Sequence, residues 1–174
     1  MPKFFAVLAG AALALTLASC ASSSDPKMAV PDKPPVDVIH ADPTLYANTY
    51  GSYTFRIGGG TVWCTINPQP SYAVCEQNGP DVQYKLPATP AGCDYAYGYQ
   101  SRLWAVQPSQ GKIAEFMCSS GLYADPTGAS DLPNNNEITV GTITCYAADT
   151  IARCDNATGQ YIALGSTVYG FGNN

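Results

Sequence analysis

The sequence of 174 residues predicts an all-β fold, a small antiparallel sandwich or barrel that is built of hairpins and stapled by disulfides. Three observations favour this class. No window of a dozen residues carries a helical i, i+3, i+4, i+7 stripe that is free of Gly and Pro. Short β-branched and aromatic runs alternate with turn residues. Six cysteines are distributed through the C-terminal 130 residues or so, a usual size for one domain with one core.

The predicted strands are short and closely spaced, as in sandwiches and barrels. Between them stand clusters of Gly, Pro, Asn and Ser, which mark turns. In chain order the strands are Ser52–Ile57, Thr61–Asn67, Ala73–Glu76, Val82–Leu86, Leu103–Val106, Lys112–Cys118, Glu137–Tyr146, Ile151–Asp155, Tyr161–Leu164 and Thr167–Phe171.

Two segments repeat one hairpin pattern, G-T-aliphatic-x-C on the first strand and A-x-C-acid-amide on the returning strand. Because side chains alternate along a strand, the two cysteines of such a hairpin meet across the pair. We therefore pair Cys64 with Cys75 and Cys145 with Cys154, which leaves Cys93 for Cys118. The repeated segments are Gly60–Cys64 with Ala73–Gln77, and Gly141–Cys145 with Ala152–Asn156.

The N-terminus has the pattern of a lipoprotein signal peptide over residues 1–19. Phe4–Leu17 is an apolar run of about 14 residues, shorter than the roughly 20 that a transmembrane helix needs. Leu17-Ala18-Ser19-Cys20 then reads as a lipobox with Cys20 as the lipidated residue. The alternative is an ordinary secretory peptide that is cleaved at a similar place. Lipidation of Cys20 also leaves six cysteines, an even number, for disulfides.

Residues 20–44 are rich in Ser, Pro, Asp and Lys, and we expect them to form a flexible tether ahead of a domain at 45–174. The net charge of −5 argues against nucleic acid and against a basic membrane patch as partners. The predicted membrane contact is therefore the lipid on Cys20. This places the chain on the outer face of a bacterial cell membrane.

The order of the cysteine strands resembles a six-cysteine all-β domain of actinobacterial secreted proteins and lipoproteins, a family without a settled biochemical function. The chain differs from it at Gly58-Gly59-Gly60, before the first cysteine strand, and at Thr158-Gly159-Gln160. The motifs that carry the resemblance are Phe55, Val62-x-Cys64, Val74-Cys75-Glu76, Cys93, Phe116-x-Cys118, Ile143-Thr144-Cys145, Cys154-Asp155-Asn156 and Tyr169.

Motifs of the common enzyme classes are absent from the sequence. It contains no G-x-S-x-G turn, H-E-x-x-H pair, P-loop or dinucleotide fingerprint. The single histidine, His40, falls in the expected tether, so we expect a non-catalytic domain without cofactor or metal. A carboxylate-dependent hydrolase remains the alternative, and its catalytic pair would come from Glu76, Asp94, Glu115, Glu137 and Asp155.

Two further segments offer ligand groups. The oxygen-rich stretch from Asp125 to Glu137 reads as a loop, because it lacks the regular acid spacing of a calcium site. Three tyrosines at every second position form an aromatic stripe that suits a sugar face or a protein partner. The expected binding residues are Tyr95, Tyr97 and Tyr99, which Trp63, Trp104 and Tyr123 could join. The alternative is that these tyrosines cover a core with their hydroxyls turned to water.

The sequence thus predicts a membrane-anchored lipoprotein whose β domain binds a wall polysaccharide or an envelope protein. An envelope hydrolase and a surface lipoprotein that excludes phage are the alternatives, and the latter leaves no residue-level signature.

Overall fold

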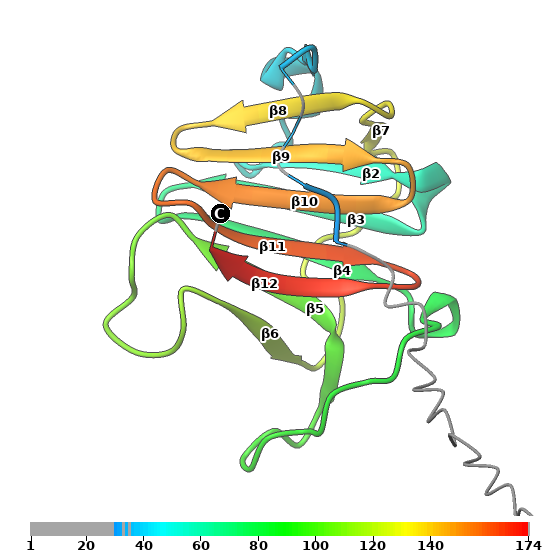
Figure 1. Cartoon of the computed structure of the whole chain (residues 1–174), viewed down its shortest axis with the longest axis vertical. Helices are drawn as coiled ribbons and strands as arrows, with labels where there is room; N and C mark the ends of the chain where they lie inside the picture. The colour runs from blue at the N-terminus through cyan, green and yellow to red at the C-terminus, as the bar shows by residue number, and fades with distance from the viewer. Residues whose placement is uncertain (1–29, 33, 35, 174) are drawn as a thin grey trace, which may run out of the picture.

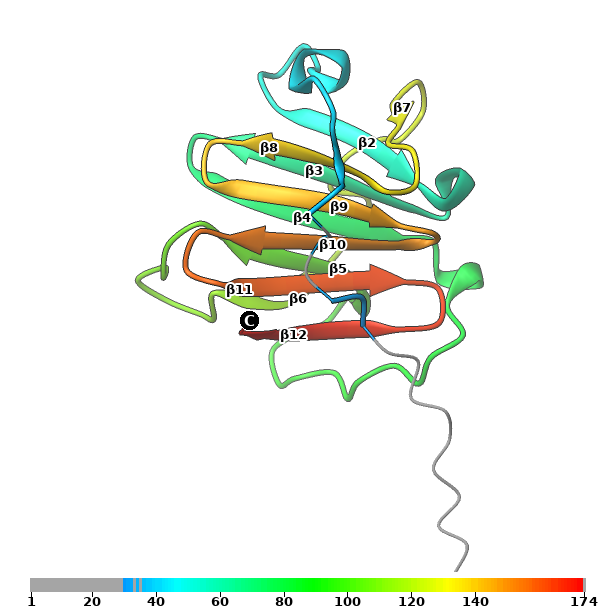
Figure 2. The same cartoon turned by 45° about the horizontal axis from the view of Figure 1, so that its top comes forward.

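A computed structural model describes residues 30–32, 34 and 36–173. It consists of two six-stranded sheets packed face to face (Figures 1 and 2). The predicted all-β class and the sandwich arrangement are confirmed, and neither sheet closes into a barrel. No helix among the described residues is long and apolar enough to cross a bilayer.

The N-terminal sheet has the strand order β6-β5-β4-β3-β2-β7. Three short 3-10 helices, η1 (Pro43–Tyr46), η2 (Gly58–Gly60) and η3 (Gly79–Asp81), lie along the connections of this half. Its strands are β2 (Tyr53–Ile57), β3 (Val62–Pro68), β4 (Ser71–Gln77), β5 (Ala96–Trp104), β6 (Ala114–Ser119) and β7 (Ser130–Asp131).

The C-terminal sheet has the order β1-β8-β9-β10-β11-β12 and lies in front in Figure 1. Each sheet is a five-stranded antiparallel meander completed by one two-residue parallel strand. The added strand comes from the other half of the chain, since β1 pairs with β8 and β7 pairs with β2. The strands of this sheet are β1 (Ile39–His40), β8 (Asn136–Val140), β9 (Ile143–Ala148), β10 (Ile151–Asn156), β11 (Gln160–Gly165) and β12 (Tyr169–Asn173).

The core lies between the sheets and has two disulfides at its centre. Cys64 stands directly opposite Cys75, and Cys145 opposite Cys154, as the repeated hairpins predict. The two bridges face each other across the sandwich, with the Sγ atoms of Cys75 and Cys154 3.6 Å apart. The third bridge, Cys93–Cys118, also has the predicted pairing and ties a long loop to β6. Fully buried aliphatic residues surround the central bridges, among them Ile57, Ile66, Leu103, Ile138, Ile143 and Leu164.

A chain segment crosses the outer face of each sheet. The crossing loop (residues 120–129) joins β6 at one edge of the N-terminal sheet to β7 at the other edge. The strap (the described residues between 30 and 41) crosses the C-terminal sheet, from Val30 beside Gly170 of β12 to β1 beside β8 (Figure 2). Both outer faces are therefore partly covered, and outward-facing side chains such as Trp63, Val74 and Arg153 are buried.

Three sequence predictions need correction. Val82–Leu86 forms no strand, because Pro80 and Pro87 bracket it and Tyr84 packs inward against the ring of Tyr169. Glu137–Tyr146 is two strands, which turn at Gly141 with φ +62°. Only Leu103 and Trp104 of the predicted strand Leu103–Val106 lie in a strand, at the end of β5, which begins at Ala96.

The expected boundary between tether and domain at residue 45 also shifts toward the N-terminus. Pro31 accepts a hydrogen bond from Arg153, and Ile39–His40 is part of a sheet, so the folded part includes the strap. Cys20 and the signal peptide lie outside the described residues.

Candidate functional site

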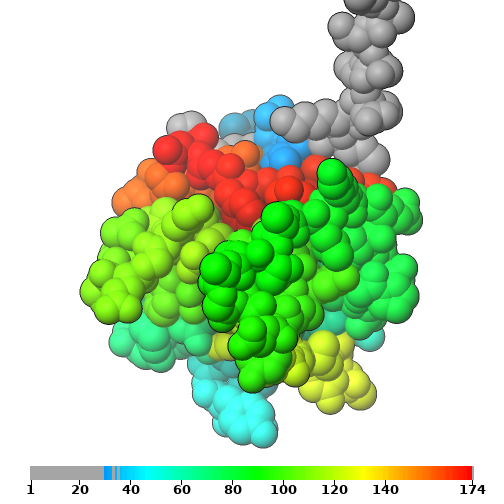
Figure 3. All heavy atoms as spheres, turned by 90° about the horizontal axis from the view of Figure 1, so that it is seen from below, coloured from blue at the N-terminus to red at the C-terminus, as the bar shows by residue number. Residues whose placement is uncertain are grey.

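A groove of about 620 Å³ lies on the outer face of the N-terminal sheet. One wall is the segment around η1, residues 45–52, and the other is the crossing loop with β7. Both walls protrude on the side of the molecule opposite β10–β12, in cyan and yellow in Figure 3. The walls meet at one end, where the hydroxyl of Ser130 donates to the carbonyl of Leu45 at 3.5 Å. The side chains that line the groove include Tyr46, Asn48, Tyr50, Thr54, Thr65, Asn67, Tyr123 and Asp125.

The floor of the groove is made by the outward side chains of β2 and β3. Thr54 and Thr65 are direct partners across the strand pair, and their hydroxyls are hydrogen-bonded at 3.0 Å. Asn67 follows at the next outward position, because side chains alternate along the strand. The inward residues of the same strands, such as Phe55 and Ile66, belong to the core. A rigid sheet thus presents a row of uncharged polar groups.

The first wall is fixed by Asn48. Its Oδ1 accepts the backbone N–H groups of Tyr50 and Ser52 at 3.0 and 3.1 Å, and its Nδ2 donates to the Ser52 and Thr54 hydroxyls. Every polar atom of the Asn48 side chain is therefore used to hold the turn. This turn carries the ring of Tyr50 out to 92% exposure at the mouth of the groove.

The second wall is held down by Glu76, whose side chain is only 1% exposed. Its carboxylate accepts the backbone N–H groups of Tyr123 at 2.6 Å and Ala124 at 2.9 Å. Two side chains, Trp63 through Nε1 at 2.9 Å and Gln100 through Nε2 at 2.6 Å, donate to the same carboxylate. Burial raises the pKa of Glu76, and these four hydrogen bonds act in the opposite direction.

Tyr123 connects the wall to the floor. Its hydroxyl accepts a hydrogen bond from Asn67 Nδ2 at 2.9 Å and is hydrogen-bonded to the hydroxyl of Tyr72. Burial raises the pKa of Tyr123, with Tyr72 adding to the shift, so the phenol stays protonated. The network leaves Asn67 Oδ1 without a partner among the described residues and open to a ligand.

Asp125 is the single charged residue of the groove lining. Its Oδ1 accepts the backbone N–H of Thr127 at 2.8 Å, and hydrogen bonds from Thr127 lower the pKa of Asp125. No basic residue of the described part of the chain lines the groove. The groove therefore offers aromatic rings, neutral polar groups and one carboxylate.

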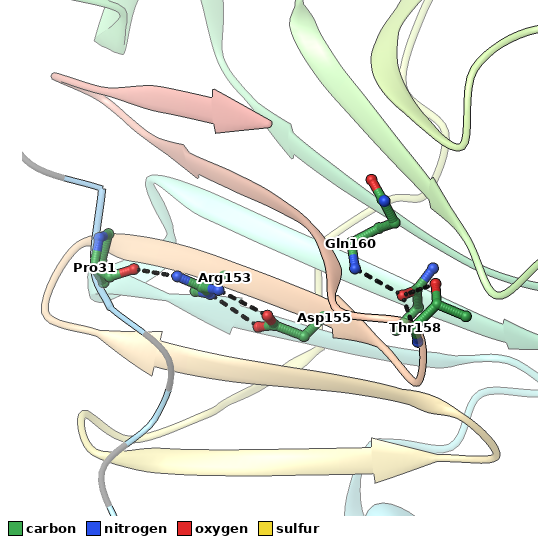
Figure 4. A network of polar contacts seen from close by, with 6 residues as sticks. Pro31, Arg153, Asp155, Thr158 and Gln160 are labelled. Atoms are coloured by element: carbon green, nitrogen blue, oxygen red, sulfur yellow. Dashed lines mark hydrogen bonds and ion pairs between the residues drawn. The ribbon is translucent and has the colours of Figure 1, made fainter. Parts of the chain in front are cut away.

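A second hollow of about 550 Å³ lies on the opposite face, beside the strap. Arg153 donates to the Pro31 carbonyl at 2.6 Å and is paired with Asp155 through Nε and Nη2, as Figure 4 shows. His40 Nδ1 lies 2.7 Å from Glu137 Oε1 at the edge strand. Among the residues that the structure describes, no Phe, Trp or Tyr lines this hollow, and its ionisable groups hold the strap.

The residues expected to form the aromatic stripe do not share one surface. Trp63 faces outward but is only 1% exposed beneath the crossing loop, where its indole N–H donates to Glu76. Tyr97 packs against Phe116 with ring centroids 5.7 Å apart, while Tyr95 and Tyr99 line a separate hollow of about 530 Å³. The stripe breaks because Gly98 adopts φ +96° and the β5–β6 register shifts between Tyr97 and Ser101.

Trp104, the other expected stripe residue, lies apart from the groove. Its ring is half-buried, with the Tyr72 ring 4.8 Å away, centroid to centroid, and the Arg102 guanidinium 4.8 Å from its centroid. Trp104 therefore supports Tyr72, which in turn contacts Tyr123 of the crossing loop.

Most of the carboxylates considered for hydrolysis have structural partners. Glu76 holds the crossing loop, Glu115 pairs with Arg102 at 2.9 Å, and Glu137 pairs with His40. Asp155 pairs with Arg153, and Asp94 lies exposed beside Cys93. Glu137 and Asp155 both line the second hollow, Glu137 beside His40 and Asp155 beside Arg153.

Asn156-Ala157-Thr158 has the pattern of a glycosylation acceptor, but the side chain of Asn156 has a structural role. Asn156 is 6% exposed, and its Oδ1 accepts hydrogen bonds from Thr158 and from the backbone N–H of Gln160 (Figure 4). Its Nδ2 donates to the Trp104 carbonyl. The side chain of Asn156 thus organises the β10–β11 turn.

The comparisons with known proteins return no relatives. No protein-family model, no curated protein and no solved structure matches this chain.

Proposed function

We propose that this protein is a lipid-anchored envelope protein whose non-catalytic β domain binds a glycan in the groove of the N-terminal sheet. The observation that carries the proposal is the lining of this groove, where tyrosines and uncharged hydroxyl and amide groups surround a single carboxylate. The C–H face of a sugar ring packs on aromatic rings, and its hydroxyl groups pair with amides and hydroxyls. A concave site with a few placed polar groups is the usual form of a small-ligand site.

The fixed walls support binding without a conformational change. Asn48 uses its polar atoms to hold one wall, and Glu76 uses both carboxylate oxygens to hold the other. A preformed site loses less conformational entropy when the ligand binds. The membrane part of the proposal rests on the lipobox that ends at Cys20.

Co-sedimentation of the full chain, in detergent micelles, with purified cell-wall polysaccharide tests the proposal. We expect Tyr50→Ala to reduce the bound fraction at least fivefold, because an exposed ring at the mouth of the groove is lost. Tyr95→Ala is the matched control, since this tyrosine is 62% exposed and lies outside the groove. Equal binding by wild type and Tyr50→Ala, or a loss only in Tyr95→Ala, would contradict the assignment of the groove.

The anchor is checked with the same chain carrying Cys20→Ala. We expect this variant to leave the membrane fraction, because the lipid would be the membrane contact. Retention of the variant in that fraction would contradict the anchor and leave the glycan site untouched.

A further inference from the structure

We infer that the groove selects amine-bearing glycans over anionic ones, with the Asp125 carboxylate receiving the ammonium group of the ligand. This inference rests on the proposed glycan site and names its ligand class. Three features of the groove support it: its charge, its excess of hydrogen-bond acceptors and the position of the exposed ring.

The charge of the groove excludes anionic ligands. Three of the five basic residues in the described part of the chain, Arg56, Arg102 and Arg153, are paired with acids. The other two, Lys85 and Lys112, do not line the groove. A phosphate or carboxylate on the ligand would therefore meet Asp125 without a countercharge, and like charges in one site repel each other.

Asp125 is available for a cation. Thr127 donates its backbone N–H to Oδ1 at 2.8 Å, and its side chain is also hydrogen-bonded to the carboxylate, so Asp125 is held in one orientation. The side chain of Asp125 is exposed, so a ligand can approach it. An exposed carboxylate that is held in place by a neighbouring residue suits an ammonium group.

The two amide side chains of the groove leave one acceptor atom open. Asn67 Nδ2 is committed to Tyr123, which leaves Oδ1 as the open atom of this side chain. The amide of Asn48 is fully used within its turn. A ligand rich in N–H and O–H donors, with a ring face for Tyr50, therefore matches the groove, and an amino sugar has these groups.

Calorimetric titration with two oligosaccharides of equal length tests this inference. One is an oligomer of glucosamine with free amines, and the other is the same oligomer with every amine acetylated. We expect the full chain to bind the amine form about threefold to fivefold more tightly, the range of a solvent-exposed ion pair. The preference should decrease at high salt, because salt screens exposed charges.

Asp125→Asn is the decisive variant. Asparagine keeps one oxygen that can accept the Thr127 N–H, removes the charge and replaces the second oxygen with an NH₂ donor, which cannot accept a hydrogen bond from an ammonium group. We expect it to abolish the preference for the amine form while binding of the acetylated oligomer stays unchanged. Asp94→Asn is the matched control, because Asp94 is an exposed acid that does not line the groove.

Three outcomes would overturn the inference. They are equal or tighter binding of the acetylated oligomer, a preference that survives in Asp125→Asn, and binding of neither oligomer. In the first case, loss of acetylated-oligomer binding in Tyr50→Ala would still support the glycan site. In the third case, co-sedimentation with wall polysaccharide decides separately whether the proposed function stands.

Discussion

The two halves of the molecule have the same frame and different outer faces. Each half is a short parallel strand followed by a five-stranded meander, with a disulfide between the second and third meander strands. The second cysteine of each bridge lies on β4 in one half and on β10 in the other. An outward side chain of the same strand holds the segment that crosses the outer face of the sheet. In the N-terminal half Glu76 accepts backbone N–H groups, and in the C-terminal half Arg153 donates to a backbone carbonyl.

This difference explains why only one face carries the proposed site. The position two residues before Glu76 is Val74, which is buried without charge beneath the crossing loop, whereas the equivalent position before Asp155 is Arg153. The N-terminal face therefore leaves tyrosines, threonines and amides for a ligand. On the C-terminal face, the polar groups bind the strap instead. A conserved frame with variable outer faces is how one fold supports different functions.

The largest expected effect comes from removing a central disulfide, the feature that both halves share. We expect the double replacement Cys64→Ala with Cys75→Ala to lower the free energy of unfolding by about 2–4 kcal/mol, and Cys145→Ala with Cys154→Ala to do nearly the same. The bridges span similar separations, 11 and 9 residues. Urea unfolding followed by tryptophan fluorescence measures both. A large loss of unfolding free energy in one double variant and none in the other would show that the two bridges are not equivalent.

An intermediate effect is expected from Glu76→Gln. This substitution should weaken the attachment of the crossing loop, which Glu76 holds, and leave the strap, which Arg153 holds, unaffected. The new NH₂ group would face backbone N–H donors, leaving buried donors unpaired at a cost of about 1–3 kcal/mol. Limited proteolysis should then cut the crossing loop faster while the strap keeps its wild-type rate. The control is Glu115→Gln, which breaks a half-buried surface pair with Arg102 and should change stability by less than about 1 kcal/mol. Faster cleavage of the strap alone would contradict this division.

The smallest expected effect is a pH dependence that belongs to the N-terminal half. Burial raises the pKa of Glu76 in the folded state, so folding favours its protonated form. The stabilisation that protonated Glu76 gives to the fold is full below the ordinary glutamate pKa of about 4.3. It is lost as the pH rises through the raised pKa of Glu76 in the folded state. Unfolding free energies measured across this range should decline in wild type more than in Glu76→Gln. Parallel pH profiles for the two proteins would show that the carboxylate does not titrate in this way.

Local features of the fold could be predicted from the sequence. The cysteine pairing follows from residues that face each other across one hairpin, such as Cys145 and Cys154, and needs no knowledge of the rest of the chain. The alternation on β2 and β3 likewise predicts which residues face the core. The split at Gly141 and the bulge at Gly98 were missed, because a glycine within an apolar run does not show from its sequence whether it turns, bulges or continues the strand.

The candidate site could not be predicted, because it depends on contacts between distant segments. Tyr50 and Asp125 belong to segments far apart in the chain, and a parallel pair of only two residues, β2 with β7, brings their segments together. Periodicity predicts the outward direction of Trp63 but not the loop that covers it. In the sequence, only the cluster of Tyr46, Asn48 and Tyr50 just ahead of β2 indicates the first wall of the groove.

The pairing of β1 with β8 and of β7 with β2 also affects the order in which the strands can pair during folding. A ribosome delivers Ile39 and His40 long before Asn136 and Glu137, the residues beside which they finally lie. Contacts between such distant residues form slowly. Until the strap arrives, the open edge of β8 can accept the same two-residue strand from another copy of the chain. Crowded, newly made chains therefore have a built-in route to an exchanged dimer, in which each copy completes the other's sheet.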